Sequence, residues 1–163
     1  MPPGWPVGAR NLPGRVSARL ASYLDAPELA RLNQAFNGVI EPPERLAERM
    51  RRPGRVDLPV LAEMDGRAIG FASLRLVPCV FYAEPYAELT ELYVEPGYRR
   101  RGAGRALMTY VEKFAREQGA ANLVLLTGFN NGDGQAFYTS LGYARDDISM
   151  VKSLEKPAQT RSE

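Results

Sequence analysis

The hydrophobic period of this chain changes abruptly across one glycine-rich stretch, residues 91–115, and this change most constrains the fold. Leu92 and Val94 alternate as on one face of a strand, and Pro96-Gly97 then stops the strand. Beyond the glycines, apolar residues recur at the spacing of one helix face: Leu107, Tyr110, Val111, Phe114 and Ala115. Gly119 follows, where a helix commonly ends in a left-handed residue. The pattern predicts a strand, a glycine loop and a helix in succession.

The glycine loop suits an anion. Gly102 and Gly104 have no side chain to block a close approach, and the first helical N–H groups after them lack a partner within the helix. The helix dipole adds roughly 0.3–1 kcal/mol for each neighbouring negative charge. The same end of the helix also carries four positive side chains, namely Arg99, Arg100, Arg101 and Arg105. The helix dipole alone would favour acidic residues there. A bound phosphate group would account for these arginines.

Two common phosphate-binding motifs do not fit this loop. The P-loop of nucleoside triphosphatases needs a lysine and a hydroxyl residue where this chain has Ala103 and Gly104. The dinucleotide-binding motif G-x-G-x-x-G begins at Gly102, but its third glycine would be Leu107. The next predicted strand, residues 122–127, also lacks the acidic residue that binds ribose.

A third motif fits. The segment "RRRGAG", residues 99–104, resembles the acyl-CoA-binding signature R/Q-x-x-G-x-G/A of the GNAT superfamily of N-acetyltransferases. In that family an asparagine and a tyrosine-containing helix follow the next strand. The segment "NNGDGQAFYTSLGY", residues 130–143, resembles this second motif and supplies Asn131, Tyr138 and Gly142 in the same order. Both motifs occur at the family's separation, so the chain resembles a GNAT protein.

The residues before the central strand predict two helices. Asp25 and Glu28 have the spacing of a capping box. The helix that follows has an apolar stripe and an Asn37-Gly38 stop; the stripe is Leu29, Leu32 and Phe36. A second, shorter helix is expected to begin near Pro43 and to bury Leu46 and Met50.

Further strands complete the predicted order of elements. Asp65-Gly66 joins two apolar runs and predicts a hairpin, while Pro59 indicates an edge or a bulge. A final strand is expected near residues 148–154. The resemblance implies a single-domain α/β fold with a mixed sheet. Its N-terminal part is mostly antiparallel, two parallel strands splay at the cofactor site, and helices cover both faces. We expect an N-acetyltransferase domain over residues 16–154, between a flexible lead-in, 1–15, and a flexible tail, 155–163.

Composition limits the chemistry. The chain of 163 residues is 45% apolar, which suits one domain, and it contains no histidine, which excludes a Ser-His-Asp triad and leaves no plausible zinc site. The only cysteine, Cys79, cannot form an internal disulfide, and we expect it in the core. No apolar run approaches the roughly 18 residues of a membrane span, and no secretion signal is evident, so we expect a cytoplasmic protein. The net charge of +2 is too small to indicate nucleic acid.

The resemblance implies that acetyl-CoA is the acyl-donor co-substrate, with no metal. Backbone N–H groups along the loop would hold its pyrophosphate, which leaves the arginine side chains for the outer phosphates; the loop residues are Arg99, Arg100, Arg101, Gly102, Ala103, Gly104, Arg105 and Ala106. The pantetheine arm would run along the central strand and bond the main chain of Leu92, Tyr93 and Val94. An N–H group at or near Val94 would face the thioester oxygen as it becomes an oxyanion.

The chemistry of amine acetylation needs a base and an acid. A lysine-like amine, with a pKa of about 10.4, must lose a proton before it attacks. Glu91 is our first choice for the base, and Glu88 is the second. By resemblance, Tyr138 donates a proton to the departing thiolate and Asn131 holds the pantetheine amide; a phenol with a pKa of about 10 is a competent donor.

The acceptor stays open. The segment "FYAEPYAELTE", residues 81–91, mixes aromatic and acidic side chains that would suit an organic cation, although an ordinary surface loop is an alternative. Polyamines, aminoglycoside-like amines, amino acids and protein amino groups are all candidates, and the sequence leaves a longer acyl donor and a homodimer open. Two other functions also remain: a CoA-binding sensor without turnover, and a nucleic-acid binder whose affinity falls steeply with salt.

Overall fold

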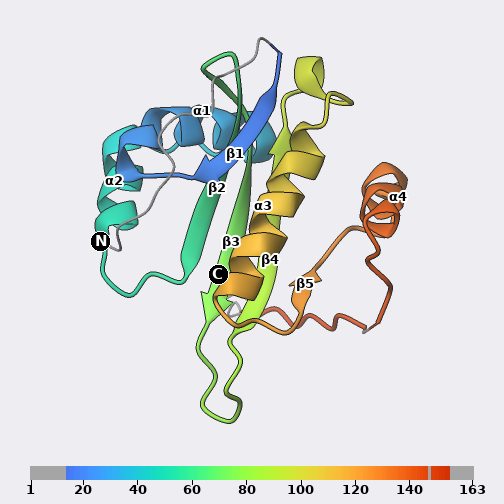
Figure 1. Ribbon diagram of the computed structural model, residues 1–163. Coiled ribbons are helices and arrows are strands. Elements are labelled where there is room, and N and C mark those ends of the chain that lie inside the picture. The colour runs from blue at the N-terminus through green and yellow to red at the C-terminus, as the bar shows by residue number, and fades with distance from the viewer. Residues whose placement is uncertain (1–13, 147, 155–163) are drawn as a thin grey trace, which may run out of the picture. The chain divides into compact units, whose positions relative to one another are not determined.

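The computed structural model describes residues 14–146 and 148–154. Most of the predicted lead-in, residues 1–13, and the predicted tail, 155–163, lie outside these ranges. The elements are β1 (Val16–Leu20), a 3-10 helix η1 (Tyr23–Asp25), α1 (Ala26–Asn37), α2 (Pro43–Arg51), β2 (Asp57–Met64), β3 (Arg67–Val77), β4 (Tyr86–Val94), a 3-10 helix η2 (Pro96–Tyr98), α3 (Ala103–Glu117), β5 (Leu123–Leu125) and α4 (Gly132–Ser140). They fall into two compact units, which meet in the sequence between Leu126 and Thr127. Figure 1 shows the elements.

The first unit is built on a five-stranded sheet in the order β1-β2-β3-β4-β5. The strands β1 to β4 pair antiparallel, whereas β5 pairs parallel to β4. The parallel pairing runs only from Ala87 to Leu89 of β4, and β4 then continues to Val94 without β5. The predicted mixed sheet with a splayed parallel pair is therefore confirmed.

Helices cover both faces of this sheet, as predicted (Figure 1). The helix α3 lies against β1 to β4 and buries one stripe of side chains: Leu107, Met108, Val111 and Ala115. On the opposite face, α1 and α2 pack on a second core cluster, whose largest members are Leu29, Leu32, Met50, Leu61, Phe71 and Tyr93. The periodicity of the sequence thus predicted most of these buried faces, but Phe36 of the predicted stripe is 42% exposed, and the buried Met108 was not among the predicted residues.

The predicted β2–β3 hairpin is present. Asp65 and Gly66 have φ angles of 50° and 79°, as expected for a two-residue turn with both φ angles positive. Pro59 lies opposite Ala21, just beyond the last β1–β2 pair, Leu20 and Val60, and its carbonyl oxygen accepts from the N–H of Ala21 (2.8 Å). Proline has no N–H to donate in return, so the pairing with β1 ends there. The bulge of β2 falls between Ala62 and Glu63 instead.

The predicted capping box was one turn too late. The reciprocal hydrogen bonds join Ser22 and Asp25: the Ser22 hydroxyl accepts from the N–H of Leu24 (3.2 Å), and the Asp25 carboxylate accepts from the N–H of Ser22 (2.7 Å). Asp25 makes no side-chain cap on α1 itself. The reason is that η1 precedes α1, so the chain begins to turn earlier than the apolar stripe indicates.

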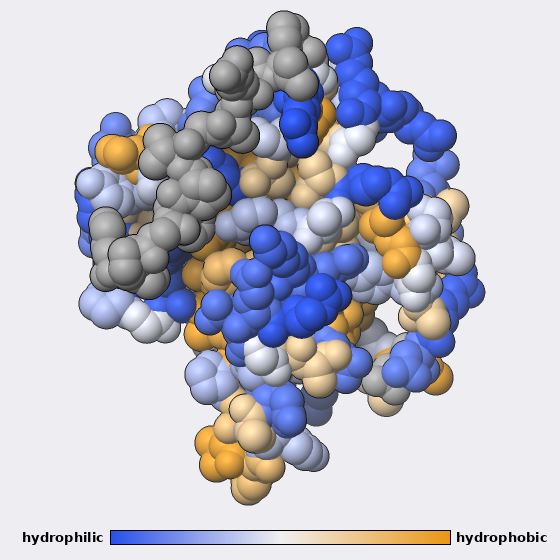
Figure 2. All heavy atoms as spheres, in the orientation of Figure 1, coloured by the Kyte–Doolittle hydropathy of each residue, from blue (hydrophilic) through white to orange (hydrophobic). Residues whose placement is uncertain are grey.

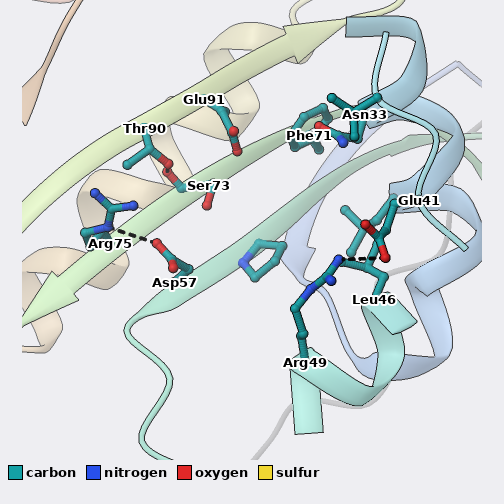
Figure 3. A pocket seen from close by; sticks show the side chains of 13 residues that line it. Asn33, Glu41, Leu46, Arg49, Asp57, Phe71, Ser73, Arg75, Thr90 and Glu91 are labelled. Carbon is teal, nitrogen blue, oxygen red and sulfur yellow. Dashed lines mark hydrogen bonds and ion pairs between the residues drawn. The ribbon is translucent and has the colours of Figure 1, made fainter. Parts of the chain in front are cut away.

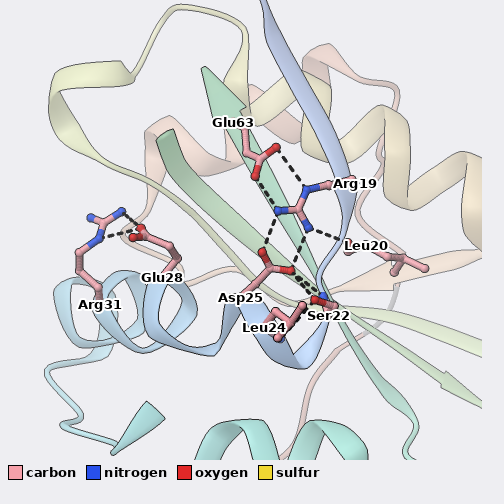
Figure 4. Close-up of polar contacts among 8 residues, drawn as sticks. All are labelled: Arg19, Leu20, Ser22, Leu24, Asp25, Glu28, Arg31 and Glu63. Carbon is pink, nitrogen blue, oxygen red and sulfur yellow. Dashed lines mark hydrogen bonds and ion pairs between the residues drawn. The ribbon is translucent and has the colours of Figure 1, made fainter. Parts of the chain in front are cut away.

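An ion cluster joins β1, β2 and η1 (Figure 4). The Arg19 guanidinium donates two hydrogen bonds to Asp25, at 2.9 and 2.7 Å, and two to Glu63, at 3.2 and 2.6 Å. These bonds favour the charged form of Asp25 and lower its pKa from 3.8 to about 2. The cluster ties the first strand to the start of the helical face.

Two other predictions were wrong. Residues 148–154 form no strand, and their apolar side chains are exposed, with Ile148 at 90% and Val151 at 93%. A strand persists only when another strand satisfies its backbone, and the described residues give this segment no such partner. Cys79 is only partly buried, because it follows the end of β3 in the connection to β4, where the chain has left the sheet.

No helix within residues 14–146 and 148–154 is long and apolar enough to cross a membrane.

Candidate active site

The loop between β4 and α3 leaves backbone donors uncovered. The N–H of Ala106 makes the first helical bond, to the carbonyl oxygen of Gly102 (2.9 Å). Within the part of the chain that the structure describes, the N–H groups of Ala103, Gly104 and Arg105 make no hydrogen bond. Gly102 caps the helix with a φ of 88°, a left-handed conformation that favours glycine. The loop thus has the free donors and the helix dipole of an anion site.

Two of the predicted backbone donors are already bonded within the protein. The predicted range of backbone donors included Arg99 and Ala106, but the N–H of Arg99 faces the carbonyl oxygen of Pro96 (3.4 Å), and that of Ala106 belongs to the helix. The N–H groups of Arg100, Arg101 and Gly102 also make no hydrogen bond to any described residue. Open backbone donors therefore run from residue 100 to residue 105.

The arginines of the loop divide into two kinds. Arg99 is structural, because its Nε donates to the carbonyl oxygen of Val94 (3.0 Å) and ties the loop to the end of β4. The exposed Arg100, Arg101 and Arg105 form no ion pair with the described residues, although the Arg101 guanidinium lies 5.8 Å from the ring centre of Tyr98. Three of the four predicted arginines are thus available to a phosphate.

The outer edge of β4 is open beyond β5. The N–H of Glu95 donates to the carbonyl oxygen of Ile69 beside β3 (2.9 Å). Because alternate residues of an antiparallel strand direct their N–H groups to opposite sides, Tyr93 also faces β3, whereas Leu92 and Val94 face the outer edge. The Tyr93 side chain is buried against α1. Of the three predicted main-chain contacts, only Leu92 and Val94 are oriented to bond an extended ligand.

A pocket of about 380 Å³ lies on the α1 and α2 face of the same sheet. Figure 3 shows Glu91, Thr90 and Ser73 projecting from the strands on one side of it, with Glu41 and Arg49 on the other. Apolar side chains line the space between them: Leu29, Val39, Leu46, Pro59 and Phe71. The pocket is concave, as small-molecule sites are, and eight of its thirteen lining residues are polar or charged.

The structure distinguishes the two predicted bases. Glu88 is held by Arg75, whose Nη1 lies 3.3 Å from its carboxylate and whose Nε donates to Asp57 (3.0 Å). Glu91 forms no hydrogen bond or ion pair with the described residues and lines the pocket. Its burial, and then the charge of Asp57, raise its pKa above the ordinary value, while Arg75 partly opposes them. Glu91 is therefore the carboxylate with an uncommitted proton-accepting oxygen.

The second unit contains the other two predicted site residues. Asn131 caps α4, since its Oδ1 accepts from the N–H of Gly134 (3.1 Å) and its Nδ2 donates to the hydroxyl of Thr127 (3.2 Å). The segment "GDG", residues 132–134, is thus the first turn of a capped helix. Tyr138 is half-buried, its ring centre lies 5.9 Å from that of Tyr143, and burial raises its pKa above 10.0.

Comparison with known proteins decides the family. Residues 26–143 match the model of the acetyltransferase (GNAT) family. The chain belongs to the GNAT family. The GNAT fold and the resemblance that the sequence motifs indicated are both confirmed.

This GNAT protein has several N-acetyltransferase relatives. It is 31% identical over 116 residues to an aminoglycoside N(6')-acetyltransferase type 1 of Klebsiella aerogenes, a match that covers 70% of this chain and 74% of that enzyme. It is also 31% identical over 94 residues to an aminoalkylphosphonate N-acetyltransferase of Salmonella typhimurium, covering 58% of this chain and 61% of that enzyme. Among solved structures, an aminoglycoside acetyltransferase from an uncultured soil sample, in complex with trehalose, has a TM-score of 0.74 at 18% identity, covering 86% of this chain and 97% of that one. At that identity the structural likeness shows the fold alone.

The predicted aromatic and acidic cluster does not gather in this GNAT protein. Phe81 and Tyr82 are 90% and 74% exposed in the connection between β3 and β4, whose tip is hydrophobic in Figure 2. Neither residue lines the pocket; of that segment, only Thr90 and Glu91 do.

Sequence reasoning missed the rest of the pocket. Its polar residues come from several segments, namely Asn33, Glu41, Arg49, Asp57, Ser73 and Arg75. One signal was available, because Ser73 and Arg75 interrupt an apolar strand at two-residue spacing and therefore share a face. The Glu41 and Arg49 side of the pocket had no such signal.

Proposed function

We propose that this GNAT protein transfers an acetyl group from acetyl-CoA directly to the primary amine of a small molecule. The observation that carries the proposal is the position of Glu91. It lies in a pocket on one face of β4, while the same strand has an open edge and ends at a loop of free N–H groups. A donor on the edge and an acceptor in the pocket would meet at one strand.

The residues of the first unit fit the donor. The N–H groups of residues 100–105 would bind the pyrophosphate, and Arg100, Arg101 and Arg105 would face the outer phosphates. The main chain of Leu92 and Val94 would bond the pantetheine amides as an added strand does. An outward N–H of the same edge would stabilise the oxyanion that develops on the thioester.

In the proposed reaction, Glu91 accepts a proton from the ammonium form of the acceptor, directly or through water. The free amine attacks the thioester carbon, so a C–N bond forms, and the C–S bond breaks when the oxyanion collapses. Tyr138 donates its proton to the leaving thiolate, and the nitrogen loses its second proton to solvent. The products are an N-acetylated amine and CoA.

The names of the relatives support an amine of small size. One acts on aminoglycosides and the other on aminoalkylphosphonates, and both substrates carry a primary amine on a small molecule. The pocket volume of about 380 Å³ also favours a small acceptor.

The test is a screen of amines with acetyl-CoA that reads thiol release and identifies the acetylated product by mass spectrometry. Calorimetry measures acetyl-CoA binding on the same protein. We expect binding and amine-dependent release of thiol. Binding without release for every amine would favour the CoA-binding sensor. DNA affinity that falls with salt, without acetyl-CoA binding, would favour the nucleic-acid binder.

A further inference from the structure

The far side of the pocket contains a buried acceptor without a donor. Glu41 Oε1 is buried and makes no hydrogen bond to any described residue. It lies 3.2 Å from Arg49 Nη2, so the two groups form an ion pair without hydrogen-bond geometry. Leaving a buried acceptor without a hydrogen bond is destabilising, because the acceptor has lost its bonds to water. A donor group on a ligand would remove that cost.

The charges around the pocket favour a cation at both sides. Its lining carries the carboxylates of Glu41, Asp57 and Glu91 and the guanidinium groups of Arg49 and Arg75. Each arginine already faces a carboxylate: Arg49 faces Glu41, and Arg75 faces Asp57. Glu91 has no such partner among the described residues, and Glu41 Oε1, although ion-paired with Arg49, accepts no hydrogen bond from them. Neither arginine is left over for an anionic group.

Apolar side chains also line the pocket, among them Leu29, Leu46 and Phe71. Figure 3 labels Leu46 and Phe71. Methylene groups would lose contact with water there, at about 0.8 kcal/mol each. A ligand that fits all three parts has a cationic amine at each end and an aliphatic chain in the middle.

We infer that the acceptor is a short aliphatic diamine, with the reacting amine at Glu91, the second amine at Glu41 Oε1 and the methylene chain against the apolar wall. This inference rests on the proposed N-acetyltransferase function. The second amine supplies the missing donor to Glu41 and takes no part in the reaction.

Three acceptors, each with five saturated carbons next to the reacting amine, test the inference: 1,5-diaminopentane, 1-aminopentane and 6-aminohexanoate. After correction for the two equivalent amines of the diamine, we expect its kcat/KM to exceed that of the monoamine by about 10-fold or more, the effect of one hydrogen bond to a charged group. The aminohexanoate should be the poorest acceptor, because its carboxylate would meet Glu41. Diamines with four to eight methylene groups, each compared with its monoamine, locate the best length.

Glu41→Gln is the diagnostic variant, since it keeps the shape and removes the charge. The ratio of diamine to monoamine kcat/KM should fall by about 10-fold. Glu48→Gln is the matched control, because Glu48 lies on α2, the helix that follows Glu41 and carries Arg49, is exposed and, among the described residues, pairs with Arg52 alone. That variant should keep the wild-type ratio.

The outcomes separate this inference from the proposed function. Thiol release with equal kcat/KM for monoamine and diamine would overturn the inference and leave the acetyltransferase intact. Preference for 6-aminohexanoate would assign the far side to Arg49 and overturn it as well. If no amine releases thiol, the proposed function fails. Calorimetric binding of 1,5-diaminopentane to the wild type and to Glu41→Gln then decides the inference alone, since equal affinity would refute it.

Discussion

Glu91 opposes folding at neutral pH, and it is the base of the proposed reaction. Its carboxylate is half-buried without a partner among the described residues, and burial raises its pKa above the ordinary value. The folded protein therefore holds this proton more tightly than the unfolded chain does. Stability is lost as the pH rises from the ordinary pKa through the raised one, and at neutral pH the charged Glu91 is destabilising.

Replacing Glu91 with glutamine should separate the two effects. Glu91→Gln removes the buried charge, so the urea midpoint at pH 7 should rise, while turnover should fall by about 10²–10⁴-fold because the base is lost. Urea unfolding and thiol release measure the two properties. Glu88→Gln is the control, because it deprives Arg75 of an ionic partner and should not raise the midpoint. A stable Glu91→Gln protein with full turnover would remove Glu91 from the reaction.

The pH dependence of the reaction should also reveal the raised pKa of Glu91. The base must be ionised, so kcat/KM should rise with pH through the pKa of Glu91, which burial holds above 4.5. The profile from pH 4 to pH 8, measured by thiol release, tests this limb. In Glu91→Gln the limb should vanish and leave only the titration of the amine. Persistence of the limb in that variant would assign it to another group.

Tyr138 should matter through its hydroxyl alone. Tyr138→Phe keeps the ring contacts with Phe137 and Tyr143, so the fold and the affinity for acetyl-CoA should be retained. Turnover should fall by about 10²–10⁴-fold, or roughly 3–5 kcal/mol in the barrier. Thiol release and calorimetry measure the two quantities, with Tyr110→Phe on α3 as the control. Equal turnover, with chemistry shown to be rate-limiting, would make Tyr138 a packing residue.

At the scale of elements, ion pairs hold the start of the loop between β4 and α3. Glu95, directly after β4, accepts from Arg31 of α1 and from Arg67 of β3. Arg31 also donates to the carbonyl oxygen of Ala68 (2.7 Å), and the Arg67 guanidinium lies 5.5 Å from the ring centre of Tyr98. Two neighbouring elements thus hold the point at which the loop leaves the sheet.

Gly104 is the better glycine with which to test that site. Gly102 has a positive φ, so any side chain there is strained whether or not a ligand binds. Gly104 belongs to the first turn of α3 and has no positive φ, so valine is compatible with its backbone. Gly104→Val should keep the thermal midpoint and weaken acetyl-CoA by about 10-fold or more, because the β-branched side chain blocks the approach of a phosphate. Calorimetry measures the affinity.

The control for this variant is Thr109→Val, which introduces the same residue at an exposed position of α3. It should leave acetyl-CoA affinity unchanged. If Gly104→Val also binds acetyl-CoA normally, the pyrophosphate lies elsewhere.

At the scale of the whole molecule, the Arg19 cluster should contribute to acid stability. Asp25 has a folded pKa of about 2 against an ordinary value of 3.8. Because the folded pKa is the lower one, the stabilisation is complete above pH 3.8 and is lost as the pH falls towards 2. Asp25→Asn should therefore reduce the free energy of unfolding by roughly 1–2 kcal/mol at pH 7.

The loss should shrink as the pH falls towards 2, where about half of the wild-type Asp25 carboxylates are protonated. Urea unfolding at pH 7 and near pH 2.5 measures the difference. Glu117→Gln is the control, because its exposed pair with Lys113 should contribute less than about 1 kcal/mol. A loss that is constant with pH would mean that Asp25 acts by packing or capping rather than by charge.

The sequence by itself determined the features that depend on near neighbours in the chain. The period change around residues 91–115, the Asp65-Gly66 turn and the stop at Gly38 predicted β4, α3, the β2–β3 hairpin and the end of α1. These signals are reliable because a turn with positive φ or an amphipathic stripe is specified within a few residues. The loop that carries the proposed phosphate site was predicted for the same reason.

Only the tertiary structure decided the features that depend on distant partners. Pairing with β3 determines that Leu92 and Val94, and not Tyr93, face the open edge of β4. Residues 148–154 were predicted as a strand from their pattern, but a strand exists only where another backbone pairs with it. The pocket joins Glu41 to Glu91 across three strands and two helices. The burial that raises the pKa of Glu91, and the ion pairs that commit Glu88 to Arg75, come from residues far apart in the chain, so no local pattern could specify them.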